Sequence, residues 1–130
     1  FLKTLVEKHN ASEYIHFFGT LPRITLLQYV KASDVFALNT GYEGLSHQLI
    51  EAMSLHTPVV TTNIPGNKEL IRDGISGILL SYNDKKAFTD TLIRVLSEFD
   101  TSEIVNQAFK ISQTFTYERM IEETIDVLNI

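Results

Sequence analysis

The sequence has no cysteine among its 130 residues, and this absence excludes disulfide bonds, thiolate catalysis and cysteine-ligated zinc. Long hydrophobic runs are also missing, since no apolar stretch approaches the roughly 18 residues that a membrane-spanning helix requires. The first residues lack the basic and apolar segments of a secretory signal peptide. We therefore expect a cytoplasmic protein that folds in a reducing environment.

Positive charge is scarce as well. The chain carries 11 basic against 16 acidic side chains, for a formal net charge of -5. The basic residues are scattered, whereas nucleic acids and anionic membranes bind clustered Lys and Arg. This excludes nucleic acid as a partner. Hydrophobic residues make up 44% of the chain, enough for the core of one domain. Because no linker-like segment interrupts it, we expect a single domain spanning residues 1–130.

Short apolar, β-prone runs alternate with segments of helical spacing. The expected strands are Ile15–Phe18, Val35–Leu38, Val59–Thr61 and Ile78–Leu80. None of them alternates apolar with polar residues, which favours strands that are covered on both faces. The alternation of such strands with helices predicts an α/β fold, in which a parallel sheet carries helices on its faces.

Helical spacing marks the segments between these strands and the tail. The segments run from Pro22 to Tyr29, from Ser46 to Leu55, and from Phe88 to Leu96. Asn83 or Asp84 is the expected cap of the third segment. Toward the C-terminus apolar residues recur at three- and four-residue steps, and Thr116 stands where a helix cap belongs. We therefore expect the chain to end in two amphipathic helices with no further strand.

The loop Asn39–Ser46 is the most informative stretch, because it joins an expected strand to an expected helix. Ligands of open parallel sheets bind at the carboxyl ends of the strands. A helix start at that edge offers unpaired N–H groups and a positive dipole end, which attract phosphate. Gly44 allows a close approach of the backbone, and Ser46 can cap the helix or donate its hydroxyl. A capped helix after a turn explains the loop equally well.

Glu51 stands alone as a carboxylate in an otherwise apolar part of the following helix. A buried ionised carboxylate is costly unless it is paired, so Glu51 either reaches solvent at the helix edge or binds a polar ligand. Glu43 lies eight residues earlier, in the loop. Two carboxylates on either side of a phosphate-binding helix start suit a sugar nucleotide, whose hydroxyls need acceptors at both ends.

The segment Glu43–Met53 resembles the E-x7-E motif of retaining GT-B glycosyltransferases, notably glycosyltransferase family 4 (group 1). Other segments resemble the family in the same order along the chain. They are Ile15–Gly19, Ala32–Phe36, Thr57–Thr62, Glu69–Gly77 and Phe115–Glu118. The resemblance covers nearly the whole chain. It implies the Rossmann-like, donor-binding C-terminal half of the GT-B fold, with helices on both faces of the sheet.

The resemblance implies roles for the residues of the motif. Glu43 would contact hydroxyls of the donor sugar at the catalytic centre, as a binding group rather than a nucleophile. Backbone N–H groups around Gly44, Leu45 and Ser46 would hold the diphosphate. Glu51 would accept hydrogen bonds from the ribose hydroxyls.

The resemblance also implies the reaction. A hexosyl group would pass from a UDP- or GDP-linked donor to an acceptor with retention of the anomeric configuration, and Gly19 and Thr20 would lie close to the base. The protein would contribute positioning and electrostatic stabilisation of the departing diphosphate. There is no Asp-x-Asp and no His-Glu-x-x-His in the sequence, so we expect neither a metal nor another cofactor.

Each of three side chains near the motif can be interpreted in two ways. His56 stands where the family usually has glycine, at a position that needs a positive φ. We interpret His56 as a structural variant of the helix end, with a donor-pocket role as the alternative. His47 either lies near the phosphates or is an ordinary surface imidazole, and Glu69 either reaches the sugar or is a solvated charge.

Two strands of the family's domain, with an Arg and a Lys that bind the donor phosphates, are missing from this sequence. We therefore expect the strand Ile15–Phe18 to lack its neighbour. The isolated chain should be inactive and poorly stable, unless a homo-oligomer or a remodelled sheet covers its edges. A sugar, polysaccharide or lipid-linked acceptor would bind through an absent N-terminal domain. A lipid-linked acceptor would bring peripheral attachment at the inner face of the membrane.

Other functions are known for acidic α/β domains of this length. A response-regulator receiver is excluded, because its strand ends need acidic residues and a phosphorylatable aspartate. The strand ends here carry Gly19, Asn39, Thr62 and Ser81. A sugar-nucleotide epimerase with the GT-B fold and a non-catalytic nucleotide-sugar-binding subunit would share the donor site, and both stay open.

Overall fold

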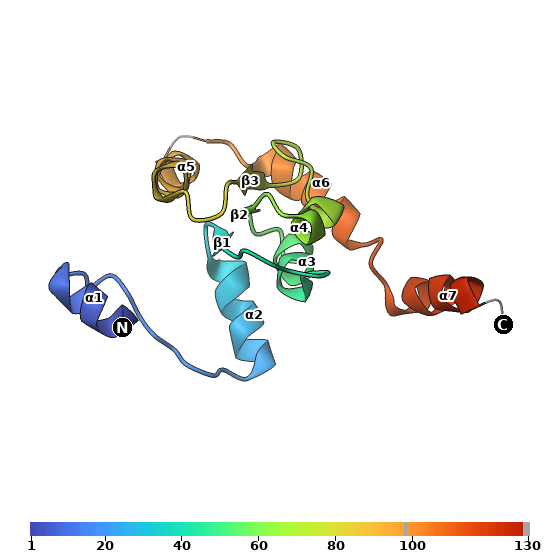
Figure 1. The fold of residues 1–130 in the computed structure, drawn as a ribbon, viewed down its shortest axis with the longest axis horizontal. Helices are drawn as coiled ribbons and strands as arrows, with labels where there is room; N and C mark the ends of the chain where they lie inside the picture. Colours follow the sequence, from blue (N-terminus) through green and yellow to red (C-terminus); the bar gives the residue numbers. More distant parts are fainter. Residues whose placement is uncertain (98, 129–130) are drawn as a thin grey trace.

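The computed structural model describes residues 1–97 and 99–128 (Figure 1). The elements follow in the order α1 (Leu2–Lys8), α2 (Arg23–Ala32), β1 (Phe36–Leu38), α3 (His47–Ser54), β2 (Val59–Thr62), α4 (Pro65–Leu70), β3 (Ile78–Leu80), α5 (Lys85–Ser97), α6 (Ser102–Ser112) and α7 (Tyr117–Leu128). Within the described ranges, no helix is both long and apolar enough to cross a membrane.

The strands form one parallel sheet in the order β1-β2-β3. Phe36 pairs with Val59, and Val60 pairs with Ile78. These strands match three of the four expected ones to within one residue at either end. The parallel α/β fold is therefore confirmed.

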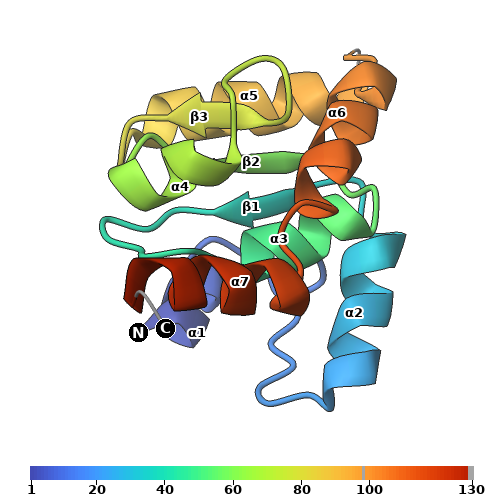
Figure 2. The same ribbon diagram turned by 90° about the vertical axis from the view of Figure 1, so that its right-hand side faces the viewer.

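Helices cover both faces of the sheet. Figure 1 shows α3, α4 and α6 on one face and α5 on the other, and Figure 2 shows the strands between them. Val59 packs with Leu49, Met53 and other residues of the first face, whereas Val60 belongs to the cluster under α5. Successive side chains of a strand point to opposite faces, so the apolar pair Val59-Val60 supplies both layers. This confirms the expectation of strands that are covered on both sides.

The expectation of a strand at Ile15–Phe18 is wrong. This segment runs outside the sheet, between α1 and α2 (Figure 1). Three of its side chains are largely exposed, at 44% for Ile15, 47% for Phe17 and 52% for Phe18. The Phe18 ring instead lies 4.5 Å from the ring of Tyr29 on α2. An extended segment becomes a strand only when another strand pairs with its backbone groups. No described strand pairs with residues 15–18.

Two expected helix caps are confirmed. The Asp84 carboxylate accepts a hydrogen bond of 2.9 Å from the Ala87 N–H at the start of α5. The Thr116 hydroxyl accepts one of 3.2 Å from the Arg119 N–H at the start of α7. The described chain also ends in two helices, α6 and α7, as the spacing predicts. The helix α1 was not expected, and none of its residues is buried.

His56 adopts the positive φ that its position requires, at +58°. Its ring stacks on Phe109 of α6, with centroids 4.2 Å apart and an interplanar angle of 23°. The backbone of a non-glycine residue is strained in this region, and the stacked ring pair offsets part of that cost. These contacts support the interpretation of His56 as a structural residue at the end of α3.

This arrangement predicts an order of stability at position 56. The variant His56→Ala loses the ring pair but keeps the strained backbone, whereas His56→Gly loses the ring pair and relieves the strain. We expect His56→Gly to be more stable than His56→Ala by about 1 kcal/mol, as measured by urea unfolding. Equal stabilities, or a more stable alanine variant, would contradict the account.

Candidate functional site

The candidate site is centred on loop 39–46, which joins the carboxyl end of β1 to the start of α3. Ser46 precedes α3 with an extended backbone, at φ -80° and ψ 100°. The first N–H groups of a helix have no acceptor within that helix. They therefore present positive partial charge at the carboxyl edge of the sheet, which is the usual ligand side of such a fold.

The Ser46 hydroxyl has no partner at this helix start. The residue is buried, with 3% of its surface exposed, and among the described residues nothing hydrogen-bonds its Oγ. It makes no side-chain bond to cap α3, which rules out capping as its role. A buried hydroxyl without a partner costs about 1–3 kcal/mol. Ser46 Oγ is therefore a buried polar atom at the start of α3 whose hydrogen bond no described residue supplies.

Helix α4 holds the loop through Gly66. A Cβ at Gly66 would lie 2.1 Å from the Gly44 carbonyl oxygen and 2.3 Å from that of Glu43. By contrast, a Cβ at Gly44 would have no neighbour within 4 Å. Gly66 thus allows the packing inside the protein, whereas the open side of Gly44 leaves room for a ligand to approach the backbone.

Asn67, which the sequence analysis missed, fixes the strand ends beside the loop. Its Nδ2 donates to the hydroxyls of Thr61 and Thr62, at 3.0 and 3.2 Å, and to the Thr62 carbonyl at 3.0 Å. The same hydroxyls donate to the carbonyls of Leu38 and Thr40, at 2.8 and 2.6 Å. All three donors are fully buried or nearly so. A signal was available, since two threonines end an expected buried strand and an asparagine follows shortly after.

Glu51 lies at the edge of α3 and is paired with Arg23, the first residue of α2. Nη2 of Arg23 lies 2.6 Å and Nε 3.2 Å from the same carboxylate oxygen, Oε1. The Glu51 side chain is 28% exposed. The carboxylate therefore reaches solvent at the edge of the helix and has a cation beside it, and its binding of a polar ligand stays a prediction.

The remaining expected residues lie around these elements. Glu43 is partly buried in the loop, and its carboxylate has no hydrogen-bond partner in the described part of the chain. Gly19, with φ +64°, and Thr20 are exposed on the segment that leads into α2. Arg23, four residues after Gly19, contacts Glu51 from the start of α2. Leu45 is exposed and lines a neighbouring pocket.

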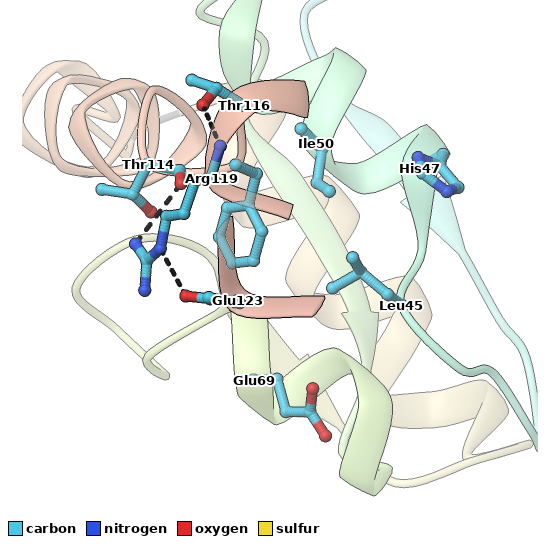
Figure 3. Close-up of a pocket in the computed structure, with 9 residues that line it drawn as sticks. Leu45, His47, Ile50, Glu69, Thr114, Thr116, Arg119 and Glu123 are labelled. Carbon is cyan, nitrogen blue, oxygen red and sulfur yellow. Dashed lines mark hydrogen bonds and ion pairs between the residues drawn. The ribbon is translucent and has the colours of Figure 1, made fainter. Parts of the chain in front are cut away.

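That pocket, of about 470 Å³, lies between α3, α4 and the start of α7. Figure 3 shows Arg119 and Glu123 on one side of it, with Leu45 and His47 on the opposite side. The Arg119 guanidinium donates hydrogen bonds to the Glu123 carboxylate at 2.7 Å and to the Thr114 carbonyl at 3.3 Å. His47 and Glu69 line the pocket too and are both exposed. No group of three or more metal-ligating side chains occurs among the described residues.

Comparison with known proteins identifies relatives of nearly the whole chain. Residues 1–110 match the family model "Glycosyl transferases group 1". The chain is 32% identical over 99 residues to the D-inositol 3-phosphate glycosyltransferase of Corynebacterium urealyticum, covering 76% of this chain and 23% of that protein. It is 26% identical over 127 residues to the O-antigen chain mannosyltransferase B of Escherichia coli, covering 97% of this chain and 33% of that protein.

The fold matches solved structures. Anabaena Alr3699/HepE, crystallised in complex with UDP-glucose, superposes with a TM-score of 0.88 at 21% identity, over 98% of this chain and 35% of that one. This likeness confirms the GT-B type of fold. The chain spans about a third or less of the length of the curated relatives that it matches.

The contact between α4 and the loop predicts opposite outcomes for two glycines. Gly66→Ala should displace residues 43–44 and lower the thermal midpoint of unfolding, because its methyl group would meet two carbonyl oxygens of the backbone. Gly44→Ala should leave the midpoint within a few degrees, because its methyl group enters open space. A Gly66→Ala variant as stable as the parent would show that the loop does not pack on α4 in this way.

Proposed function

Because this chain belongs to the glycosyl transferases group 1 family, we propose that it forms the donor-binding site for the transfer of a sugar from a nucleotide-diphosphate sugar to an acceptor. The observation that carries this proposal is the start of α3, where free N–H groups and the unpartnered Ser46 hydroxyl occur at residues that lie between Glu43 and Glu51 in the chain. The sugar, the diphosphate and the ribose of one donor would each meet a group suited to it.

The diphosphate binds at the start of α3. The backbone N–H groups of Leu45, Ser46 and His47 and the Ser46 hydroxyl supply donors, and the helix dipole favours negative charge at this point. The open side of Gly44 gives the phosphates room to approach the backbone. Charge grows on the diphosphate as the sugar departs, so donors already fixed in place stabilise the transition state more than the ground state.

The two carboxylates recognise the hydroxyls at either end of the donor. Glu43, whose carboxylate has no partner among the described residues, accepts from the donor sugar at the catalytic centre. Glu51, one turn inside α3, accepts from the ribose. Gly19 and Thr20 lie on the side of the base. The domain that this describes is a single nucleotide-sugar-binding unit over residues 1–130, and it needs no metal or other cofactor.

The finer features of the reaction follow from the same site. We propose retention of the anomeric configuration, with Glu43 acting as a binding group and not as a nucleophile. We propose uridine diphosphate as the first nucleotide to test, since a structural neighbour was crystallised with UDP-glucose. The acceptor binds through a separate part of the full-length protein, and the reaction takes place in the cytoplasm.

The two carboxylates can be separated by titration. We expect Glu51→Gln to weaken the binding of UDP and of a UDP-sugar equally, by about 1–3 kcal/mol, because a charged acceptor for the ribose is lost. Glu43→Gln should weaken only the UDP-sugar, because free UDP lacks the group that Glu43 contacts. Isothermal calorimetry with UDP, GDP and their glucose conjugates measures all of these values.

A matched control is Glu103→Gln, which removes a carboxylate of α6 that is bonded to Gln107 at 2.7 Å, away from the site. It should bind both ligands like the parent. If Glu103→Gln and Glu51→Gln weakened binding by the same amount, the loss of affinity would come from the change in net charge and not from a lost contact with the ribose. If the full-length protein bound neither UDP nor GDP, the donor-site proposal would be wrong.

Retention is tested on the reaction product. The native full-length protein should release a product whose anomeric carbon has the configuration of the donor, as read from the ¹H coupling constant at that carbon during turnover. An inverted product would contradict the retaining assignment while leaving the donor site intact. Interconversion of the nucleotide sugar without transfer would identify an epimerase instead.

A further inference from the structure

Arg23 is the one described cation that contacts a proposed donor residue. It occupies the first position of α2, and its guanidinium reaches across to Glu51 on α3, 28 residues further along the chain. Both of its contacts, at 2.6 and 3.2 Å, fall on Oε1. No described residue donates to Oε2. The pair therefore fixes one oxygen of the carboxylate and leaves the other free.

This ion pair is poorly suited to stabilising the fold. The Arg23 side chain is 75% exposed, and exposed ion pairs contribute little to folding because water screens them and long side chains lose entropy. The pair is also not the one polar contact of α2 with this part of the described chain, since Thr57, which follows α3, donates its hydroxyl to the Val30 carbonyl of α2 at 2.9 Å. The pair instead restricts the rotation of a carboxylate on which the donor site relies.

We propose that Arg23 is a positioning residue for ribose recognition. By holding Oε1, it orients the Glu51 carboxylate so that Oε2 accepts a hydrogen bond from a ribose hydroxyl of the nucleoside diphosphate. This inference rests on the proposed function, because it requires that Glu51 meets the ribose. Charge-assisted hydrogen bonds depend strongly on geometry, so an unrestrained Glu51 would recognise the hydroxyl less well.

The position of Arg23 also links two parts of the site. Gly19 and Thr20, on the side of the base, are joined to Arg23 through Leu21 and Pro22. Pro22 has a φ of -55° directly before the helix, because its ring restricts this angle. The contact of Arg23 with Glu51 thus ties the start of α2, four residues after Gly19, to the ribose carboxylate.

The test compares two ligands, UDP and 2′,3′-dideoxy-UDP, which differ only in the ribose hydroxyls. In the parent protein the ratio of their dissociation constants should be about tenfold or more, as expected for a charge-assisted hydrogen bond. Arg23→Gln should reduce this preference to about threefold or less, with the affinity for dideoxy-UDP unchanged within about twofold. Arg23→Lys, which keeps the cation, should restore part of the preference.

Lys31→Gln is the matched control. Lys31 is another cation of α2 that reaches α3, through a contact of 3.4 Å with the Leu55 carbonyl, but it lies away from Glu51. This variant should keep the full preference for UDP. A merely structural role of Arg23 would change the affinities for both ligands together and leave their ratio intact.

The other outcomes separate this inference from the proposed function. If Glu51→Gln abolishes the preference for UDP but Arg23→Gln retains it, the positioning role is wrong and the donor site stands. If Arg23→Gln binds UDP more tightly, Arg23 covers Glu51 instead of orienting it, which also overturns the inference. If UDP does not bind to the full chain, or Glu51→Gln keeps the preference, the ribose assignment fails and the inference falls with it.

Discussion

A buried hydrogen-bond network at the carboxyl edge of the sheet fixes the strand ends from which the loop before α3 starts. Asn67 donates to the hydroxyls of Thr61 and Thr62, which themselves donate to the carbonyls of Leu38 and Thr40. Since a hydroxyl has a single proton to donate, each threonine can only accept from Asn67, which fixes the orientation of its amide. The network ties α4 to β2, and β2 to the chain leaving β1. The loop before α3 therefore starts from a rigid base.

Gly66, which precedes Asn67 in α4, connects the loop to this network. Its close contact with the Glu43 and Gly44 carbonyls holds the loop against α4 and turns the open side of Gly44 outward. Two buried polar atoms of this region, Ser46 Oγ and Asn67 Oδ1, lack partners among the described residues. Most buried polar atoms in proteins are satisfied. These two exceptions stand on the residue before α3 and on α4, the two elements that hold the loop.

The sequence predicts what depends on local chemistry and misses what depends on distant partners. The cap Asp84 and the positive φ of His56 are properties of one turn of chain, and both are confirmed. The strand expected at Ile15–Phe18 has suitable residues, but a strand needs a neighbour that local pattern cannot supply. The contact of Arg23 with Glu51 joins residues far apart in the chain, so no spacing rule indicates it. The roles of Glu43 and Glu51 toward a donor stay predictions.

The central claim is that the start of α3 binds the diphosphate of the donor, and amide chemical shifts measured during a UDP titration test it most directly. The largest shifts should fall on the N–H groups of Leu45, Ser46 and His47, with smaller shifts near Gly19 and Glu51. Phosphate bound at a helix start polarises the N–H groups that it contacts. Shifts concentrated instead around Thr114 and Arg119, in the pocket beside α7, would place the nucleotide elsewhere and contradict the claim.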